Sequence, residues 1–521
     1  MTLQLASDRR PVRAAAPDWT AERAAWTLFA LLGLVTLAIL GLRPTNADTS
    51  WGLTLAEAVL SGQRLYVDIL ETNPPLTMIL HLPACLIARA TGIRPELAHH
   101  LLTLATLAGC LAVAADILRT TGRGGQVAGF VTATAMFQLV PWLNTFGERE
   151  QFAVMALLPF VALWRPPEAT GPRPWRAVLL AGIGAGLATA LKPVFALCLI
   201  VPAIHDLIAS RRIAALVRPE YLIAAALAGL YLGAAAIAYP VFFTTFSPVL
   251  ADTYFQYRMD LWPLLARPEL GNLALLTAMG WIQRRHPATP DWARAATLAA
   301  GGFLLAFLAQ AKGYLNHEMA VLSLGYLGVA GLIAPRVLSA LRQRDLASVP
   351  LVIRLTGLPL LGFLTLWLYA QEARTIPYRS MALVDEVAHV PGARTVLALS
   401  PDLDVGHPFA RSAGLRYVGS TCSQWLAQTA GERGRTRGAS PGLRARMARY
   451  VDVDLARAAT DLRTRHPDLV LLDRASGELF RSGPSAIVLQ RALAGYHPIA
   501  RQHDVELLVR NDLGTEPRSS P

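Results

Sequence analysis

The sequence predicts an all-α polytopic membrane protein with about 11 transmembrane helices, a membrane-dipping loop helix and a small C-terminal α/β domain on the periplasmic side. Of its 521 residues, 53% are hydrophobic and only 16% are charged, and the mean hydropathy is +0.38. An ordinary soluble domain does not have this composition. Apolar runs long enough to cross a ~30 Å hydrocarbon core recur as far as residue 371. The residues after 373 have ordinary polarity, which predicts a separate water-exposed domain.

The apolar runs cover residues 24–42, 75–92, 97–118, 126–143, 151–164, 177–191, 193–209, 220–240, 270–283, 296–311, 317–335 and 351–371. If all of them spanned, the arginine-rich loops would repeatedly lie on the side opposite the basic N-terminus, against the positive-inside rule. The conflict disappears if the run 75–92 does not span. This run opens with Pro74-Pro75, contains Pro83 and is flanked by Arg89 and Arg94, which is typical of a helix dipping into the outer leaflet. Eleven spans remain, with the N-terminus cytoplasmic and the C-terminus periplasmic.

This topology divides the chain into four parts. We expect a cytoplasmic N-terminal segment (1–23), a transmembrane domain (24–373) with its first outer loop at 43–96, a periplasmic α/β domain (374–513) and a disordered tail (514–521). The first apolar run is expected to be an uncleaved span, because no convincing small-residue cleavage site follows it. In the C-terminal part we expect strands at 395–399 and 469–472, a closing hairpin through 497–500 and 506–509, a helix within 440–465, and a mobile basic loop at 431–438.

Charge and cysteine usage exclude other classes. The formal charge of +12 comes from arginines scattered between apolar runs, so it indicates membrane topology and contact with membrane lipids, not nucleic-acid binding. The four cysteines, Cys85, Cys110, Cys198 and Cys422, show no metal-ligand spacing and imply no disulfide framework.

Every polar cluster that could carry chemistry falls on the predicted outer side. These clusters are 46–48, 68–75, 147–150, 191–193, 254–260 and 312–317. Ionisable residues at membrane depth are costly and usually face a cavity or a pathway. Their convergence therefore predicts one site at the outer face.

The first outer loop carries a recognisable pattern. Asp48 follows the first span, an amphipathic helix ends at a glycine, a Tyr/Asp element comes next, and Glu71-Thr72-Asn73-Pro74-Pro75 opens a second helix. The loop resembles that of the GT-C glycosyltransferases, which include protein O-mannosyltransferases and the aminoarabinose transferase acting on lipid A. The resemblance covers roughly residues 24–210. It implies a polyprenyl-phosphate sugar donor and chemistry on the periplasmic face of the bacterial inner membrane.

The carboxylates of the outer loops are the candidate catalytic residues: Asp48, Glu71, Glu148 and Glu150. Asp48 stands where the family places its catalytic or metal-linked acid, and transfer to a hydroxyl needs a base. Alternatively, Asp48 only caps the helix predicted at 49–60. A divalent cation is the candidate cofactor, although the spacing of the acids does not define a metal site.

The donor phosphate needs cations, and Lys192, Lys312 and Arg149 are the candidates. The aminoarabinose transferase has Glu-Lys-Pro-Pro in its first loop, so the lysine of that motif is missing here. Of 48 lysines and arginines only Lys192 and Lys312 are lysines, and both lie at the edge of an apolar run. An ammonium is a compact point charge that suits a phosphate oxygen. Alternatively, the two lysines are chance survivors of an arginine-rich coding bias.

Five further residues are expected to bind substrate: Asp68, Tyr254, Arg258, Asn316 and His317. Their alternatives are a solvated turn for Asp68, an interfacial aromatic belt for 254–262 and a helix-end hydrogen bond for His317.

The sequence thus predicts an enzyme, a glycosyltransferase that moves a hexose or pentose from a polyprenyl-phosphate carrier to an envelope polysaccharide, lipid or protein. Two alternatives stay open: a transporter or flippase of a lipid-linked saccharide, and a non-catalytic envelope-assembly protein. Transporters tend to show inverted repeats and spans broken near the midplane, whereas no repeat is visible here and the polar clusters lie at the outer edge.

Overall fold

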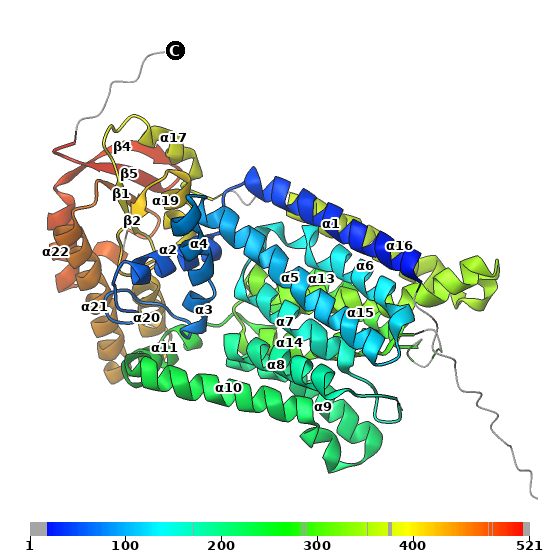
Figure 1. Cartoon of the computed structure of the whole chain (residues 1–521). Coiled ribbons are helices and arrows are strands. Elements are labelled where there is room, and N and C mark those ends of the chain that lie inside the picture. Colours follow the sequence, from blue (N-terminus) through cyan, green and yellow to red (C-terminus); the bar gives the residue numbers. More distant parts are fainter. Residues whose placement is uncertain are drawn as a thin grey trace, which may run out of the picture.

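The computed structural model describes residues 18–513 except 170, 283, 285, 287, 288, 352, 374–377, 478 and 482. Most of the predicted N-terminal segment and the predicted tail, 514–521, therefore lie outside the described residues. The described chain forms a helical bundle with a smaller mixed α/β region packed on one end of it (Figure 1).

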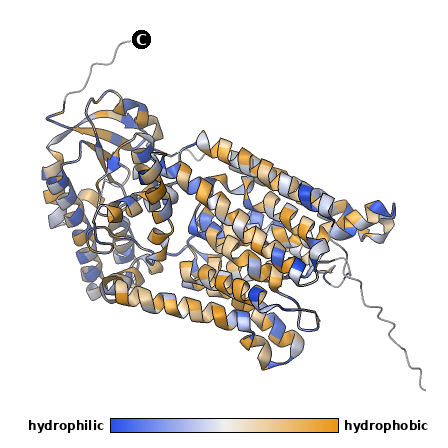
Figure 2. Cartoon of the chain, viewed as in Figure 1, coloured by the Kyte–Doolittle hydropathy of each residue, from blue (hydrophilic) through white to orange (hydrophobic). Residues whose placement is uncertain are grey.

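Each predicted span corresponds to a helix. These helices are α1 (Trp19–Gly41), α5 (Pro95–Thr120), α6 (Val127–Gln138), α7 (Arg149–Leu163), α8 (Trp175–Leu191), α9 (Leu197–Ser210), α10 (Pro219–Ala238), α13 (Pro268–Ile282), α14 (Asp291–Gln310), α15 (Leu315–Arg342) and α16 (Leu358–Ala373). Among the described residues, six stretches are long and apolar enough to cross a membrane: α1, α5, α10, α14, α15 and the continuous helical stretch Pro193–Ser210 that contains α9. The chain is therefore a polytopic membrane protein. Its bundle is visibly more apolar than the region beside it (Figure 2).

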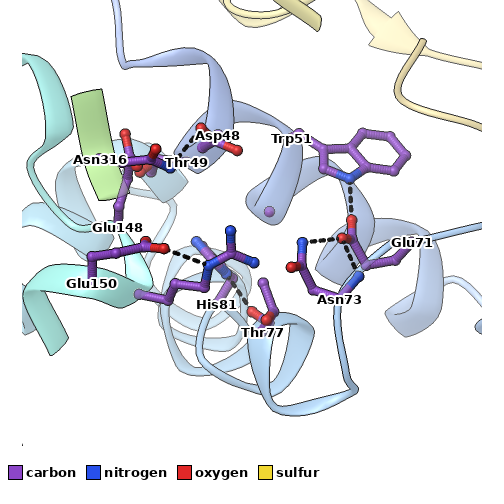
Figure 3. Close-up of a pocket in the computed structure, with 12 residues that line it drawn as sticks. Asp48, Thr49, Trp51, Glu71, Asn73, Thr77, His81, Glu148, Glu150 and Asn316 are labelled. Carbon is purple, nitrogen blue, oxygen red and sulfur yellow. Dashed lines mark hydrogen bonds and ion pairs between the residues drawn. The ribbon is translucent and has the colours of Figure 1, made fainter. Parts of the chain in front are cut away.

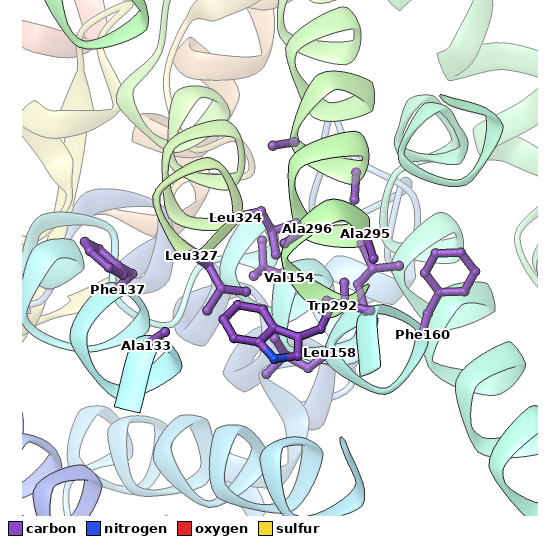
Figure 4. Close-up of a cluster of buried hydrophobic side chains, with 14 of the residues drawn as sticks. Ala133, Phe137, Val154, Leu158, Phe160, Trp292, Ala295, Ala296, Leu324 and Leu327 are labelled. Atoms are coloured by element: carbon purple, nitrogen blue, oxygen red, sulfur yellow. The ribbon is translucent and has the colours of Figure 1, made fainter. Parts of the chain in front are cut away.

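The bundle core is built from aromatic and small side chains. Trp292, Phe160, Phe137, Leu158 and Leu327 lie in one continuous cluster contributed by α6, α7, α14 and α15 (Figure 4). Small residues allow the helices to approach closely, as is usual between membrane helices. A Cβ added at Gly184 of α8 would collide with the Ala156 carbonyl of α7, and one at Gly302 of α14 would collide with the Leu197 backbone.

The arginine-rich loops gather at the end of the bundle opposite the α/β region. They hold one another through ion pairs and carbonyl contacts: Arg119 with Glu22, Arg123 with the Ala162 carbonyl, Arg165 with the Thr121 carbonyl, Arg218 with the Arg165 carbonyl, and Arg173 with Glu220. The start of α1 and the basic loops after α5, α7 and α9 therefore share one end. This segregation is what the arginine distribution predicts for a single membrane side.

The first outer loop lies at the other end. It contains α2 (Ala47–Leu60), the single-turn α3 (Leu76–Ile79) and α4 (Leu82–Thr91). The segment 75–92, predicted as one dipping helix, is interrupted at Leu80 and His81. A second irregular stretch follows α10, with short helical turns at Phe242–Phe246, Ser247–Asp252 (α11), Tyr254–Gln256 and Leu261–Leu265 (α12).

Residues 378–513, called the C-terminal region from here on, form a five-stranded sheet of order β2-β1-β3-β5-β4. The strands are β1 (Thr395–Leu399), β2 (Arg416–Tyr417), β3 (Leu469–Asp473), β4 (Tyr496–Gln502) and β5 (Val505–Arg510). β2, β1 and β3 are parallel, while β4 and β5 form the predicted antiparallel hairpin. All four strand predictions are confirmed. The fifth strand, β2, is not predicted from the sequence, because it is a two-residue edge strand that carries no hydrophobic pattern.

Helices of the C-terminal region are α17 (Val384–Val387), α18 (Leu403–Gly406), α19 (Phe409–Ser412), α20 (Trp425–Arg435), α21 (Pro441–Arg465) and α22 (Pro484–Leu493). The helix expected within 440–465 is confirmed as α21. The mobile basic loop expected at 431–438 is wrong, since 431–435 complete α20. Arg433 in this stretch pairs with Asp252 of α11, and this ion pair holds the end of α20 against α11.

One face of the sheet packs on the first outer loop. Trp51, Leu55 and Tyr66 share a buried cluster with Val396 and Phe409. The Leu70 amide donates to the Ser420 carbonyl at 2.8 Å. Arg411 bridges Glu57 and Glu96 at 2.9 Å each. The C-terminal region is therefore held over the end of the bundle where the polar clusters lie.

Candidate active site

A cavity of about 630 Å³ lies between the bundle, the first outer loop and the C-terminal region. A smaller pocket of about 30 Å³ adjoins it between α2, His81 and Glu150. The two share seven lining residues: Asp48, Trp51, Glu71, Asn73, Glu148, Arg149 and Asn316. Five of these seven, Asp48, Glu71, Glu148, Arg149 and Asn316, are predicted site residues, and they come from four of the polar clusters.

Asp48 lies in the first turn of α2 and faces the cavity (Figure 3). The helix begins at Ala47, and its cap is Asn46, whose side-chain oxygen accepts from the Thr49 amide at 2.8 Å. The alternative that Asp48 caps the helix is therefore wrong. Its Oδ2 accepts from Asn316 Nδ2 at 3.4 Å. Enclosure raises the pKa of Asp48 to about 6; Arg149 opposes the rise, while Glu150 and Glu71 add to it.

Glu71 is buried, and both of its carboxylate oxygens are occupied. Trp51 Nε1 donates to Oε2 at 2.5 Å, while the Asn73 amide and Nδ2 donate to Oε1 at 2.8 and 2.5 Å. Thr72 Oγ1 also donates to Oε1, at 3.2 Å. A carboxylate held by four donors is poorly placed to take a proton from a substrate. Its geometry suits holding the 71–75 turn against α2.

Glu148 and Arg149 are presented by a tight loop. Gly147 has φ +82°, and a Cβ there would collide with the His99 ring, whose Nε2 lies 2.9 Å from the Gly147 carbonyl. The loop therefore needs glycine at this position. The Gly147 amide donates to Gln151 Oε1 at 2.8 Å. These contacts fix the backbone from which both side chains enter the cavity.

Glu148 is a buried carboxyl group close to Asp48. It is 6% exposed, and its Oε2 has no hydrogen-bond partner among the described residues. Burial raises the pKa of Glu148 well above its ordinary value, and the charges of Asp48 and Glu150 raise it further. Two neighbouring carboxyl groups thus differ in protonation, with Asp48 the more readily ionised.

Arg149, Glu150, Lys192 and His317 form one connected group behind the cavity. Glu150 Oε1 accepts from Arg149 Nε at 3.1 Å and from Lys192 Nζ at 3.3 Å. Lys192 Nζ lies 2.9 Å from His317 Nε2. Burial lowers the pKa of Lys192 to about 7, with Arg149 adding to the effect. Arg149 and His317 line the cavity, while Glu150 is buried and holds the cations in place.

Lys312 has a different environment from Lys192. Its ammonium donates to the carbonyls of Tyr254 and Tyr257 and lies 4.1 Å from the Tyr254 ring centre. Burial lowers its pKa to about 8, with Arg258 the next cause. The residues that line the cavity include Tyr254 and Tyr257 but not Lys312. Lys312 therefore ties the 254–257 segment to the start of α15.

Two predicted substrate-binding residues lie outside the cavity. The Asp68 carboxylate forms a 3.0 Å ion pair with Arg64 and accepts from the Arg64 amide at 2.8 Å. These contacts fit the alternative interpretation of Asp68 as part of a solvated turn. Arg258 points to the Ala309 carbonyl at 2.9 Å and is exposed. The other three, Tyr254, Asn316 and His317, line the cavity.

The C-terminal region supplies a wall that the sequence motifs do not indicate. Its lining residues are Tyr378, Pro401, Asp402, Leu403, Asp404, Cys422, Ser423, Trp425, Gln428 and Thr429. Tyr378 precedes α17, and the others come from the β1–α18 connection, the start of α18, the segment before α20 and the first turns of α20. No local pattern marks them, because they meet the cavity only through the packing of the sheet on the first outer loop.

Among the described residues, no three His, Cys, Asp or Glu side chains group as a potential metal site. The expectation of a divalent cation therefore gains no geometric support from the acids at Asp48, Glu71 and Glu148.

Comparison with known proteins places the fold in a class. No protein-family model matches the sequence, and no curated protein matches it significantly. Solved structures do match over nearly the whole length, and the chain has the GT-C fold that its first loop predicts. It is similar to ArnT from Cupriavidus metallidurans bound to undecaprenyl phosphate, with 14% identity, a TM-score of 0.54, and coverage of 95% of this chain and 98% of that one. The apo state of the same protein aligns with 13% identity and a TM-score of 0.53, over 93% and 98% of the two chains.

Proposed function

We propose that this chain is a glycosyltransferase that moves a sugar from a polyprenyl-phosphate carrier to a cell-envelope acceptor at the periplasmic face of the inner membrane. One observation carries the proposal: an ionisable carboxylate, Asp48, and a guanidinium, Arg149, line the same cavity at one end of the bundle. A base and a phosphate-binding cation are the two groups that such a transfer requires. The fold shared with a protein crystallised with undecaprenyl phosphate supports the choice of donor.

The donor phosphate is assigned to the side of the cavity formed by Arg149 and His317. Arginine binds phosphate through two parallel N–H groups, and Glu150 keeps its guanidinium oriented through the Nε bond. Lys192 does not line the cavity, but its ammonium, 3.3 Å from Glu150 and 2.9 Å from His317 Nε2, adds positive charge behind Arg149 and His317. A phosphate raises the pKa of a neighbouring ammonium, so donor binding would charge this lysine fully.

The transfer is a single displacement. The acceptor hydroxyl oxygen attacks the anomeric carbon from the face opposite the phosphate, and its proton passes to Asp48. As the new C–O bond forms, the bond from the anomeric carbon to the phosphate oxygen breaks, and its electron pair leaves with the polyprenyl phosphate. Because its pKa is about 6, Asp48 is mostly ionised at neutral pH and can act as this base. Glu148, the more easily protonated of the two, can donate a hydrogen bond to the donor.

The cavity is assigned to the periplasmic side, with residues 374–513 as a periplasmic domain and eleven spans between it and a cytoplasmic N-terminus. The support is the gathering of the basic loops at the opposite end of the bundle. Reporter fusions after Arg123 and Arg173 should show cytoplasmic activity, and fusions at Gly147 and after Arg379 should show periplasmic activity. A cytoplasmic Gly147 would contradict this orientation.

The proposed function is tested with material from a strain that lacks the protein. Unused donor should accumulate in its polyprenyl-phosphate lipid fraction, and its envelope should carry unmodified acceptor. Purified protein in nanodiscs should transfer sugar from the radiolabelled lipid fraction to that envelope and should bind undecaprenyl phosphate directly. The absence of both transfer and binding would refute the proposal, and movement of intact lipid-linked sugar across the bilayer would assign the chain to transport.

A further inference from the structure

The cavity wall contributed by the C-terminal region differs in charge from the wall contributed by the bundle. Arg149 is the cation of the bundle wall. The residues of the C-terminal region that line the cavity include two carboxylates, Asp402 and Asp404, and neither lysine nor arginine occurs among those described. An anionic ligand on this wall would meet like charges without a compensating cation.

Arg379, a basic group on this side, is already neutralised. Arg379 pairs with Asp402 at 2.7 Å and with the buried Asp473 at 3.0 Å, and it does not line the cavity. Asp404 also lines the cavity, and no ion pair holds it among the described residues. This wall is therefore acidic and carries no cation among its described residues, whereas the opposite side holds Arg149 beside its carboxyl groups.

Aromatic side chains stand beside these acids. Trp425 packs edge-on against Tyr254, with ring centres 5.9 Å apart, and both line the cavity. Tyr257 and Tyr314 line it as well and are 37% and 42% exposed. The negative π face of an aromatic ring attracts the partly positive C–H groups of a sugar ring.

Polar atoms without partners complete the wall. Asp404 Oδ1 is buried and has no hydrogen-bond partner among the described residues, and neither has Glu148 Oε2 on the opposite side. When the cavity is filled, the Glu148 carboxyl needs a partner and Asp404 Oδ1 needs a donor. Sugar hydroxyls are such donors, and Gln428 and Thr429 in the first turns of α20 offer further amide and hydroxyl groups.

We infer that this wall is the acceptor subsite and that it selects an uncharged saccharide. The inference rests on the proposed function, because it assigns the second substrate of the same reaction. An acceptor bound here would be a glycan whose reacting part carries hydroxyls but neither phosphate nor carboxylate. Its sugar ring lies against the aromatic side chains and donates to Asp404, while the donor phosphate occupies the side of Arg149.

The test uses envelope glycans from the strain that lacks the protein, separated by anion exchange into a neutral and an acidic pool. Full-length protein in nanodiscs receives the radiolabelled lipid fraction of that strain together with each pool. Label should enter the neutral pool. Label in the acidic pool or on polypeptide would overturn the inference and leave the proposed function standing. Undecaprenyl-phosphate binding without transfer to either pool would also overturn it, whereas loss of both binding and transfer refutes the proposed function itself.

A double variant, Asp402→Asn with Asp404→Asn, tests the charge directly. Arg379 keeps Asp473 as a partner, so the wall remains supported. The ratio of acidic-pool to neutral-pool transfer should rise at least ~10-fold, because the like charges are gone. Asp504→Asn removes an exposed acid from the β4–β5 turn and should leave the ratio unchanged. An equal ratio in the double variant and the wild type would overturn the inference.

A second variant separates acceptor recognition from folding. Gln428→Ala should raise the acceptor KM about 10-fold while kcat and undecaprenyl-phosphate binding change little, because one uncharged hydrogen bond to the acceptor is lost. An unchanged acceptor KM would contradict the assignment of this wall.

Discussion

Replacing Asp48 with asparagine separates chemistry from structure at the centre of the cavity. The side chain is nearly isosteric and keeps an oxygen that can accept from Asn316 Nδ2. The cap of α2 is untouched, because it is made by Asn46. The variant loses only the ability to take a proton from the acceptor hydroxyl.

The expected effect on rate is large, and the expected effect on stability is small. Loss of a general base typically lowers the rate ~10²–10⁴-fold. Burial raises the pKa of Asp48, so its negative charge disfavours the folded state, and the Asp48→Asn protein should be at least as stable as the wild type. Asn46→Ala is the matched control, because it removes the cap and should cost ~1 kcal/mol or more.

The assay is single-turnover transfer from the labelled lipid fraction in nanodiscs, with undecaprenyl-phosphate binding and thermal unfolding measured on the same samples. The Asp48→Asn protein should bind the lipid normally and transfer almost nothing. In the wild type, transfer should fall as pH drops below about 6, because protonation of Asp48 removes the base. Near-normal transfer by Asp48→Asn would refute the reasoning. Glu148 would then be the next candidate, since Glu71 is held by four donors.

Three further predictions follow from neighbouring groups. Lys192→Ala should weaken undecaprenyl-phosphate binding at least ~10-fold, and Lys192→Arg should weaken it less. Lys312→Ala should lower thermal stability with little effect on binding, because the Lys312 ammonium holds two backbone carbonyls. Equal effects of the two alanine variants on binding would contradict these different roles of the two lysines. Glu148→Gln should keep transfer within ~10-fold of wild type at pH 7, because the raised pKa makes the Glu148 carboxyl neutral. A much larger loss of transfer would mean that the negative charge of Glu148 is required. Asp454→Asn should stabilise the protein at pH 8 by on the order of 4 kcal/mol, because burial raises the pKa of this carboxyl to about 7. Its Oδ2 accepts from the Ala427 amide at 2.9 Å, a bond that asparagine retains. The folded wild type binds a proton between pH ~4 and 7 that the unfolded chain releases, so wild-type stability falls as pH rises through this window. Unfolding measured at pH 5 and pH 8 checks the sign, and an unchanged difference between the two proteins would contradict it.

Several parts of this protein could be derived from the sequence because they depend on local pattern. The apolar runs predict the helices of the bundle, since a span needs only enough consecutive apolar residues. The arginine distribution predicts that the basic loops share one end, because each loop responds to the same membrane asymmetry. Alternating and apolar runs also predict four of the five strands. The motif at Asp48 and Glu71 was sufficient to indicate the GT-C fold that the structural comparison supports.

The distinctions within the site required the tertiary structure. Asp48 and Asn46 are equally good caps by residue type, and only the start of α2 at Ala47 assigns the cap to Asn46. Lys192 and Lys312 look alike in sequence, yet one meets Glu150 and His317 while the other meets two backbone carbonyls. Partners more than 40 residues away decide which of these charges is available to a ligand.

The sequence by itself determined a polytopic membrane bundle with its candidate site residues at one end, because hydrophobic length and basic loops are properties of each segment alone. Only the tertiary structure decided which of those side chains face a common cavity and that Asp402, Asp404, Trp425 and Gln428 complete it. The physical reason is that the C-terminal region reaches the cavity by packing one sheet face on the first outer loop. That contact joins segments more than 300 residues apart, such as Arg411 and Glu96, and no local pattern encodes it.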